Sequence, residues 1–272
     1  MTAHLDISIV LYQPVPRLLE ITLHTLNLAV EHVRREGHIE NCTLLLTDHS
    51  FQPLGNKQLQ DWHILLDGKM KLDYRHNPDN PGFGSGHNAA FARSGQSADY
   101  FLVANPDLEF TEESLAAGLS FLACHPDIGM LAPALIQDEH RLAPACFRYP
   151  DLLTLALRML GGRFAANRSH FYECRDWNAL QAVFSPPIIS GCCMLFRCNC
   201  FQNLGGFDPA FFLYFEDFDL SRRASQMHQS AYCPLMQVRH QGGGASRKGW
   251  KHIWMFSRSA LRFFQRHGWR WY

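Results

Sequence analysis

The stretch YFLVANPDLEFTEE, residues 100–113, contains the strand-to-helix connection that decides the fold. It opens with five consecutive apolar or aromatic side chains, as expected for a strand that is buried on both faces. The run ends at a polar turn, Asn-Pro-Asp at 105–107, after which Thr111 is placed to cap a helix that carries two glutamates in its first turn. A buried strand joined to a helix in this way is the repeating unit of a parallel sheet.

The same alternation precedes this stretch. Residues 7–12 and 42–47 are also continuous apolar runs, and residues 71–75 predict a third strand. Between the first two runs, a pair of prolines opens a helix with apolar residues at helical spacing, and Gly37 ends it. We therefore predict an α/β fold, a single domain with a mostly parallel central sheet and helices on both faces.

The second half is less regular but continues with helices and strands. We expect helices over residues 152–160 and from 216 or 217 to about 227, and strands over 188–196 and 231–238. A glycine run at 242–244 follows the last strand. The sequence shows no internal repeat or low-complexity linker, which favours one domain.

Composition excludes several classes of protein. The 272 residues carry no formal net charge and are 47% hydrophobic, which argues against a disordered chain or an overall attraction to nucleic acid. The N-terminus lacks a basic leader, and no apolar stretch approaches the roughly 18 residues of a membrane-spanning helix. We expect a cytoplasmic protein with reduced thiols, in which the cluster Cys192, Cys193, Cys198 and Cys200 consists of buried small hydrophobes, because its spacing differs from that of zinc knuckles.

Three features could carry chemistry, and each also has a purely structural interpretation. Asp107 follows a buried strand, where a carboxylate could bind Mg²⁺ or Mn²⁺ together with substrate phosphates, although Asn-Pro-Asp is also a common turn. The glycine-rich stretch at 81–88 would let the backbone approach a phosphate or a sugar, or could be a tight connection. His240, just before the glycine run, could be a metal ligand or a structural histidine.

A fourth feature is the acidic and aromatic segment YFEDFD, residues 214–219. Three acids here suit the positive end of a helix, but a carboxylate between aromatic side chains could also be a general base whose pKa is raised by burial.

In combination, these residues resemble glycosyltransferase family 2, and within it the O-antigen and cell-wall rhamnosyltransferases. The resemblance extends from residue 7 to about residue 267. It is strongest in the glycine-rich stretch 80–88, in the strand that ends in Asn-Pro-Asp, and in the long segment from Ser190-Gly191 to Leu220.

The resemblance implies an A-type nucleotide-sugar-binding fold and a single-displacement, inverting transfer. It makes Asp217 the catalytic base, Glu216 an acceptor-binding residue, and Asp107 and His240 the ligands of Mg²⁺ or Mn²⁺. Asp219 is expected to cap or pair within its helix. The donor-binding residues by position are Tyr12, Asp48, Gly82, Phe83, Gly84, Asn88 and Asn105, with Tyr12 and Asp48 at the nucleotide base.

Three positions depart from the family pattern, namely Gln13, His49 and Asn105, the last removing one negative charge from the metal motif. By resemblance the donor is dTDP-L-rhamnose, with a UDP-sugar as the alternative, and the acceptor is a saccharide or a lipid-linked saccharide in surface polysaccharide synthesis. A sugar-nucleotide pyrophosphorylase is disfavoured because no Gly-x-Gly-Thr-Arg-like loop follows the first strand. A non-catalytic nucleotide-sugar-binding protein remains an alternative.

The domain prediction places a catalytic domain at 1–246, with a nucleotide-sugar-binding half at 1–110 and an acceptor-binding half at 111–246. Residues 247–272 would form a basic amphipathic helix. Its predicted basic face holds Lys251, Arg258, Arg262 and Arg266, and its apolar face holds Ile253, Phe256, Ala260 and Phe263. Such a helix could lie on the anionic inner face of the plasma membrane, or simply pack on the catalytic domain.

Overall fold

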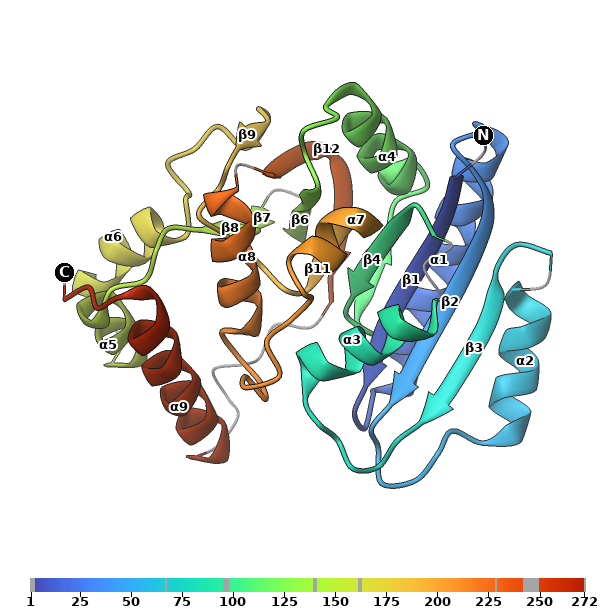
Figure 1. The fold of residues 1–272 in the computed structure, drawn as a ribbon, viewed down its shortest axis with the longest axis horizontal. Coiled ribbons are helices and arrows are strands. Elements are labelled where there is room, and N and C mark those ends of the chain that lie inside the picture. Colours follow the sequence, from blue (N-terminus) through green and yellow to red (C-terminus); the bar gives the residue numbers. More distant parts are fainter. Residues whose placement is uncertain are drawn as a thin grey trace.

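The computed structural model describes residues 3–66, 68–94, 98–138, 141–160, 163–227, 229–241 and 250–271. One sheet runs through the molecule in the order β3-β2-β1-β4-β11-β6-β12-β5 (Figure 1). Its strands are β1 (Ala3–Leu11), β2 (Ile39–Asp48), β3 (Lys71–His76), β4 (Tyr100–Ala104), β5 (Leu108–Phe110), β6 (Met130–Asp138), β11 (Cys193–Arg197) and β12 (Ser230–His240).

The first four strands of this order are parallel, as the apolar runs predict. In the register, Ile9 of β1 lies between Leu46 of β2 and Ala104 of β4, and all three side chains are buried. The carboxyl ends of these strands therefore meet at one edge of the sheet. In open sheets of this kind, ligands bind at that edge.

The strand expected over 188–196 is divided in two, which corrects the prediction. Its first part is β10 (Ile188–Ile189), which pairs with β8 (Cys146–Phe147) in a separate small sheet. Its second part, β11, is antiparallel to both β4 and β6. The chain leaves one sheet and enters the other at Ser190-Gly191-Cys192, and this crossing lies beside the candidate site.

Helices cover both faces of the main sheet, which confirms the predicted α/β architecture. On one face α1 (Pro16–Arg35) contacts α4 (Ser114–Cys124), and on the other lie α3 (Phe83–Arg93) and α7 (Cys198–Asn203) (Figure 1). The remaining helices are α2 (Asn56–Leu66), α5 (Leu152–Leu160), α6 (Arg163–Tyr172), α8 (Glu216–Gln226) and α9 (Trp250–His267).

Two helix starts differ from the prediction. α4 begins at Ser114, and its N-terminal residue Glu113 makes no capping side-chain bond, so Thr111 and both glutamates precede the helix. The glycine-rich stretch is mostly helical, because α3 already starts at Phe83. The elements α2, α6, α7 and β6 are not among those expected from the sequence.

A second, smaller hydrophobic core joins α9 to the acidic segment. It contains Phe211, Phe215, Phe263 and Phe264, each at most 2% exposed. The C-terminal helix therefore packs on the rest of the chain, as one of the two sequence interpretations requires. Within the described ranges, no helix combines the length and hydropathy that a membrane span needs. The predicted boundary at 246/247 and the glycine run at 242–244 lie outside the described residues.

Candidate active site

Asp107 and His240 come together at the carboxyl edge of the sheet. Asp107 lies in the turn between β4 and β5, and His240 is the last residue of β12, which pairs with β5 so that His240 lies opposite Leu108. The backbone N–H of Gln241 donates to the carbonyl oxygen of Asp107 at 2.9 Å and fixes this neighbourhood. Nε2 of His240 is 3.2 Å from Oδ1 of Asp107.

This pair has the chemistry of a divalent-cation site. Oδ1 of Asp107 is buried, and apart from its close approach to His240 it accepts no hydrogen bond within the described structure, although a buried polar atom normally has one. Carboxylate and imidazole ligands suit Mn²⁺ or Mg²⁺, which keep further positions for water and substrate phosphates. The two side chains therefore fit the metal that the sequence predicts, with Asp107 as the carboxylate ligand and His240 as the second.

Asp217 is held at the start of α8 by two backbone donors. The N–H of Gly191 donates to its Oδ2 at 2.8 Å, and the N–H of Phe218 donates to its Oδ1 at 3.0 Å. Burial raises the pKa of Asp217 to about 6, while the bonds from these two backbone groups oppose the rise. As a whole residue, Asp217 is half-buried. A carboxylate whose pKa is raised to about 6 suits general-base catalysis near neutral pH.

Strained backbone immediately before α8 orients its acids. Tyr214 has φ 68° and Phe215 has φ 64°, a left-handed conformation that bulky residues rarely adopt. The ring of Phe215 is 2% exposed and lies 4.8 Å from Phe218, 5.1 Å from Phe256 and 5.4 Å from Phe263 between ring centroids. Such strain persists only where surrounding packing holds it, and it is common at functional sites.

Glu216 points away from solvent. It is 5% exposed, and its Oε2 has no hydrogen-bond partner in the described structure. Burial, and then the neighbouring charge of Asp217, raises the pKa of Glu216 well above its ordinary value. Of the two acids, Asp217 is the more exposed residue. That it, and not Glu216, points squarely into the cleft stays a prediction.

Cys192 connects the metal pair and the candidate base. Its thiol accepts a bond from the Ser190 hydroxyl at 3.3 Å, and its carbonyl accepts the N–H of Asn105 at 2.9 Å. Burial, and to a smaller degree the charges of Asp107 and Asp217, raises the pKa of Cys192 to about 12. Gly191 bonds to Asp217, and Cys192 bonds to Asn105, two residues before Asp107, so the crossing from β10 to β11 links the two carboxylates.

Asp219 has a structural role. It is fully buried, and it pairs with Arg223 within α8 at 2.8 Å, as expected. It also accepts bonds from α9, with His267 Nε2 at 2.8 Å and Arg266 Nε at 3.3 Å. These charges lower the pKa of Asp219 despite its burial. These contacts tie α9 to the segment that carries Asp217, and local sequence pattern does not predict them.

Part of the predicted donor set lines a cavity of about 570 Å³ beside the same edge of the sheet. Tyr12, 50% exposed and 6.1 Å from Phe51 between ring centroids, forms one wall, and Gly82 and Phe83 form another. Gly82 has φ +103°, and a Cβ there would lie 2.3 Å from the carbonyl oxygen of Phe212. Only glycine allows the backbones at positions 82 and 212 to pass this close to each other.

Other predicted donor residues bond or pack within the protein. Asp48 is fully buried, and its carboxylate accepts the Ser50 N–H at 2.9 Å and the Tyr74 hydroxyl at 2.8 Å. These bonds fix the loop after β2, and the contact of Asp48 with a nucleotide base stays a prediction.

Gly84 and Asn88 face Phe207. A Cβ on Gly84 would lie 2.6 Å from Cβ of Phe207, and the amide of Asn88 exchanges bonds of 2.7 and 2.9 Å with the backbone of Phe207. These two residues dock α3 on the acceptor-side segment. Asn105 lies in the turn that carries Asp107, and its backbone bond to Cys192 is the contact that places it.

Three solved structures resemble the whole chain. GalNAc-T7 with UDP, GalNAc and Mn²⁺ matches with a TM-score of 0.66 and 14% identity, over 97% of this chain and 48% of that one. The mannosyltransferase PcManGT from Pyrobaculum calidifontis, in complex with GDP-Man and Mn²⁺, matches with a TM-score of 0.60 and 15% identity, over 96% and 65%. S. aureus TarS 1–349 matches with a TM-score of 0.54 and 14% identity, over 89% and 60%.

The chain has the A-type glycosyltransferase fold. Sequence identities this low show the fold alone. The structural matches confirm the predicted fold class. In sequence, the chain is 28% identical over 203 residues to N-acetylglucosaminyl-diphospho-decaprenol L-rhamnosyltransferase from two strains of Mycobacterium tuberculosis. That match covers 70% of this chain and 66% of the relative, just under two thirds of its length. No protein-family model matches. The curated relatives confirm the resemblance to rhamnosyltransferases of glycosyltransferase family 2.

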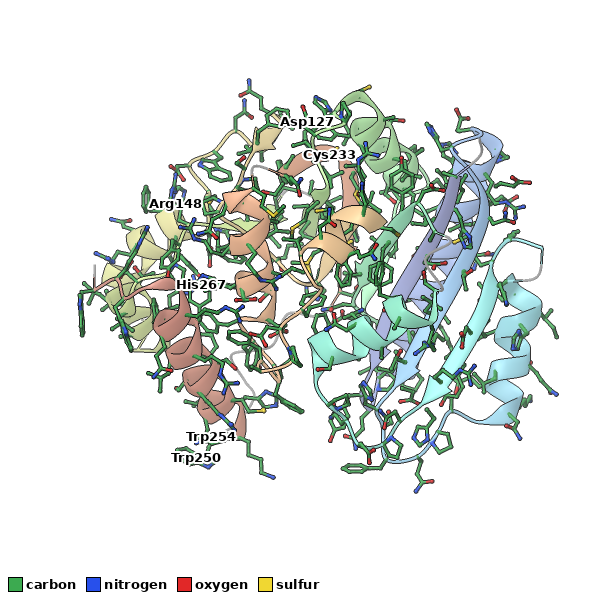
Figure 2. All side chains as sticks on the ribbon, viewed as in Figure 1. Asp127, Arg148, Cys233, Trp250, Trp254 and His267 are labelled. Atoms are coloured by element: carbon green, nitrogen blue, oxygen red, sulfur yellow. The ribbon has the colours of Figure 1, made fainter. Side chains whose placement is uncertain are left out.

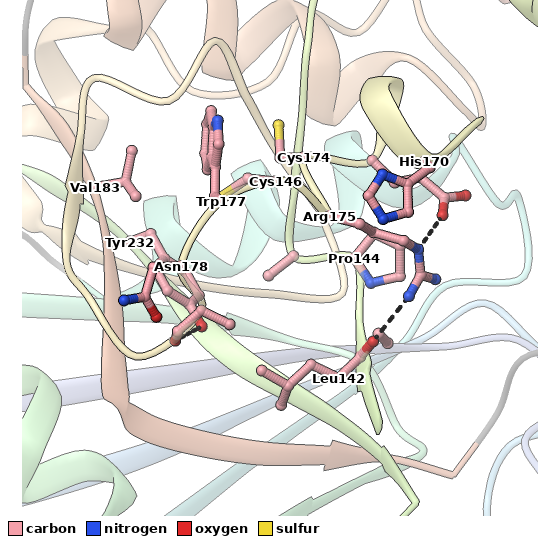
Figure 3. A pocket seen from close by; sticks show the side chains of 14 residues that line it. Leu142, Pro144, Cys146, His170, Cys174, Arg175, Trp177, Asn178, Val183 and Tyr232 are labelled. Atoms are coloured by element: carbon pink, nitrogen blue, oxygen red, sulfur yellow. Dashed lines mark hydrogen bonds and ion pairs between the residues drawn. The ribbon is translucent and has the colours of Figure 1, made fainter. Parts of the chain in front are cut away.

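A second cavity in this A-type fold, of about 710 Å³, is shown in Figure 3, and its lining residues do not include the candidate base. Cys146 of β8 lines it, while the next residue, Phe147, lies 5.8 Å from Phe218 of α8 between ring centroids. Consecutive strand residues point to opposite faces, so β8 separates this cavity from α8. Arg175 in its wall is already paired with Glu173 at 2.6 Å and with the carbonyl of Leu142 at 3.3 Å. We assign no step of the reaction to it.

The cysteine cluster is part of the core. Cys192, Cys193 and Cys200 are at most 7% exposed and belong to the main hydrophobic core, and Cys198 packs against it. The expectation that these thiols serve as small buried hydrophobes is confirmed.

Proposed function

We propose that this protein is a metal-dependent inverting glycosyltransferase that transfers L-rhamnose from dTDP-L-rhamnose to a lipid-linked saccharide in surface polysaccharide synthesis. The observation that carries the proposal is that the crossing at Ser190-Gly191-Cys192 links the Asp107–His240 pair to Asp217. The N–H of Gly191 donates to Asp217, and the carbonyl of Cys192 accepts the N–H of Asn105 in the Asp107 turn. The rhamnosyl donor and the lipid-linked acceptor are supported by the name of the curated relatives. Two fold neighbours support the metal, since one was solved with UDP, GalNAc and Mn²⁺ and the other with GDP-Man and Mn²⁺.

Each part of the site has one task in the reaction. Asp107 and His240 would hold Mn²⁺ or Mg²⁺, which supplies neutralisation of the charge on the leaving nucleoside diphosphate. Asp217 takes the proton of the acceptor hydroxyl as that oxygen forms its bond to the anomeric carbon. The bond from that carbon to the diphosphate breaks on the opposite face, so the configuration inverts and no covalent enzyme intermediate forms.

Glu216 has a supporting role in proton transfer to Asp217. Burial and the charge of Asp217 raise the pKa of Glu216, which disfavours a second negative charge beside the base. We therefore propose that Glu216 positions Asp217 as well as the acceptor.

The test is a transfer assay with purified protein, Mn²⁺, and N-acetylglucosaminyl diphospho-lipid as acceptor. dTDP-L-rhamnose and a panel of UDP-sugars are compared as donors, with the metal present or removed by a chelator. We expect transfer from dTDP-L-rhamnose only with metal. Transfer solely from a UDP-sugar would overturn the rhamnosyl assignment and keep the transferase one, whereas donor binding without any turnover would favour a non-catalytic binding protein.

We also propose that α9 contacts an anionic membrane surface through its outward face. Ile253, Trp254 and Leu261 are 46%, 52% and 48% exposed there. The sequence grouped Ile253 with Phe256, Ala260 and Phe263, which pack against the protein. Residues 250–271 contain no acidic side chain. An exposed apolar stripe with Trp and basic neighbours is typical of helices that lie in the membrane interface.

The predicted basic face is divided in the structure. Arg262 donates to the carbonyl of Ala210, and Arg266 pairs with Asp208, so these two face the protein. Lys251 and Arg258 remain exposed. Attraction to anionic lipid would therefore come from fewer charges than the helical pattern indicates.

Co-sedimentation with anionic vesicles at low salt tests this contact. The triple variant Ile253→Ser, Trp254→Ser and Leu261→Ser should lose most of the binding, while Ile64→Ser on α2, at a residue 76% exposed, should keep it. Failure of the unaltered protein to sediment with the vesicles would contradict the proposal.

A further inference from the structure

The first turn of α9 forms a wall of the cavity that contains the predicted donor residues. The cavity of about 570 Å³ is bounded by Tyr12, Gly82 and Phe83 from the first half of the chain, and by Trp250, Lys251 and His252 from α9. Figure 2 labels Trp250 and Trp254 at this end of the helix. A helix that the sequence suggests as a membrane contact thus also reaches the place where a nucleotide sugar is expected.

Three contacts hold this wall in place. The hydroxyl of Tyr214 and Nδ1 of His252 are 2.9 Å apart, and the Ser259 hydroxyl donates to the carbonyl of Leu213 at 2.9 Å. On the other side of the cavity, the N–H of Phe83 donates to the carbonyl of Phe212 at 3.0 Å. Segment 212–214 therefore bonds both to α9 and to the glycine-rich start of α3, so the cavity walls are fixed relative to one another.

The chemistry of the lining suits an anion with a flat ring system. Its lining residues include no carboxylate, and the ammonium of Lys251 makes no ion pair with any residue that the structure describes. Exposed aromatic rings of Tyr12 and Trp250 border it, the latter residue 76% exposed. A site with unopposed positive charge concentrates anionic ligands, and aromatic faces give apolar contact area for a base or a ribose.

We propose that Lys251 and Trp250 of α9 bind the nucleoside diphosphate of the donor, with Lys251 at a phosphate oxygen and Trp250 against the nucleoside. This proposal rests on the proposed function, because it takes the donor to be a nucleotide sugar. It makes the C-terminal helix part of the donor site. It also connects donor binding to the acids of α8, since His252 is bonded to Tyr214, two residues before Glu216.

Isothermal titration of dTDP and UDP in the presence of Mn²⁺, without lipid, tests the proposal. Losing one charge-assisted phosphate contact should weaken binding by Lys251→Ala about tenfold. Lys251→Arg should recover most of the affinity because it keeps the charge. Trp250→Ala should weaken binding several-fold, and Lys57→Ala, at an exposed lysine of α2, should leave it unchanged.

A further readout separates a phosphate contact from a merely structural effect. The affinity of the unaltered protein should fall with added salt more steeply than that of Lys251→Ala. Equal affinity of Lys251→Ala and the unaltered protein would overturn the inference while leaving the proposed function intact. An unaltered protein that binds no nucleotide under these conditions would contradict both.

Discussion

Replacing Gly191 by alanine should displace the carboxylate of Asp217 without changing its chemical nature. A Cβ at this position would lie 2.8 Å from Cβ of Asp217 and 3.1 Å from its Oδ2. Carbon atoms in contact prefer about 3.5–4.0 Å, so the Asp217 side chain would have to move by about 1 Å. The backbone of Gly191 has no positive φ of the kind that disfavours alanine, so the substitution acts through this contact.

A displacement of that size should lower the transfer rate strongly and change the stability of the fold little. Misplacement of a reacting group by about 1 Å can cost about 10²-fold in rate. We therefore expect kcat for sugar transfer to fall about 10²-fold in Gly191→Ala, with donor affinity unchanged, because the metal pair and the donor cavity are untouched.

The assay compares initial transfer rates at saturating donor with nucleotide affinity measured by titration. Gly55→Ala is the matched control, since a Cβ there meets no atom within 4 Å. A folded Gly191→Ala that transfers at the unaltered rate would refute the assignment of Asp217, because no base could tolerate this crowding unaffected.

Further outcomes follow from the metal pair, the acids and the second core. Asp107→Ala should abolish metal-stimulated transfer and His240→Ala should raise the Mn²⁺ concentration needed for half-maximal rate; full activity of Asp107→Ala with a chelator would contradict the metal site. Because Asp217 must be ionised to act as a base and its pKa is raised to about 6, kcat should fall about tenfold per pH unit below that value. A pH profile that stays flat down to pH 5 would exclude this base. Phe263→Ala, at a residue with no exposed surface, should lower the free energy of unfolding by about 3–5 kcal/mol in denaturant titrations. The exposed Gln265→Ala on the same helix should change it little.

The parallel half of the fold was predictable because its strands are buried on both faces. Continuous apolar runs mark β1, β2 and β4 in the sequence, and the polar residues that end them must gather at one edge. The meeting of Asp107 and His240 follows from the same reasoning, since each residue directly follows or ends a strand.

The contacts of Gly84 and Asn88 could not be predicted from local pattern. Asn88 bonds to Phe207, 119 positions away, and only the folded chain shows that this amide faces a backbone segment rather than a ligand. A glycine-rich stretch permits both close approach to a phosphate and close packing of a helix. At Gly84 the structure shows the second use, and at Gly82 it shows a crossing beside the cavity.

The prediction of one strand over residues 188–196 was wrong for a different reason. It contains Ser190-Gly191, where the chain changes sheets so that the N–H of Gly191 can reach Asp217. Periodicity reports burial, and both β10 and β11 are buried, so the division between them leaves no mark in the hydrophobic pattern.

For α9, helical spacing indicated one apolar and one basic face. The structure instead turns Arg262 and Arg266 toward the protein, because the carbonyl of Ala210 and the carboxylate of Asp208 are there to receive them.

The most direct test of the central claim is the transfer rate of Asp217→Asn, measured together with its nucleotide affinity on one preparation. The amide keeps the shape of the side chain and cannot accept the acceptor's proton as a carboxylate does. We expect transfer to fall about 10²–10⁴-fold, with dTDP affinity unchanged. Near-normal transfer by a folded Asp217→Asn protein would contradict the account and make Glu216 the next residue to test.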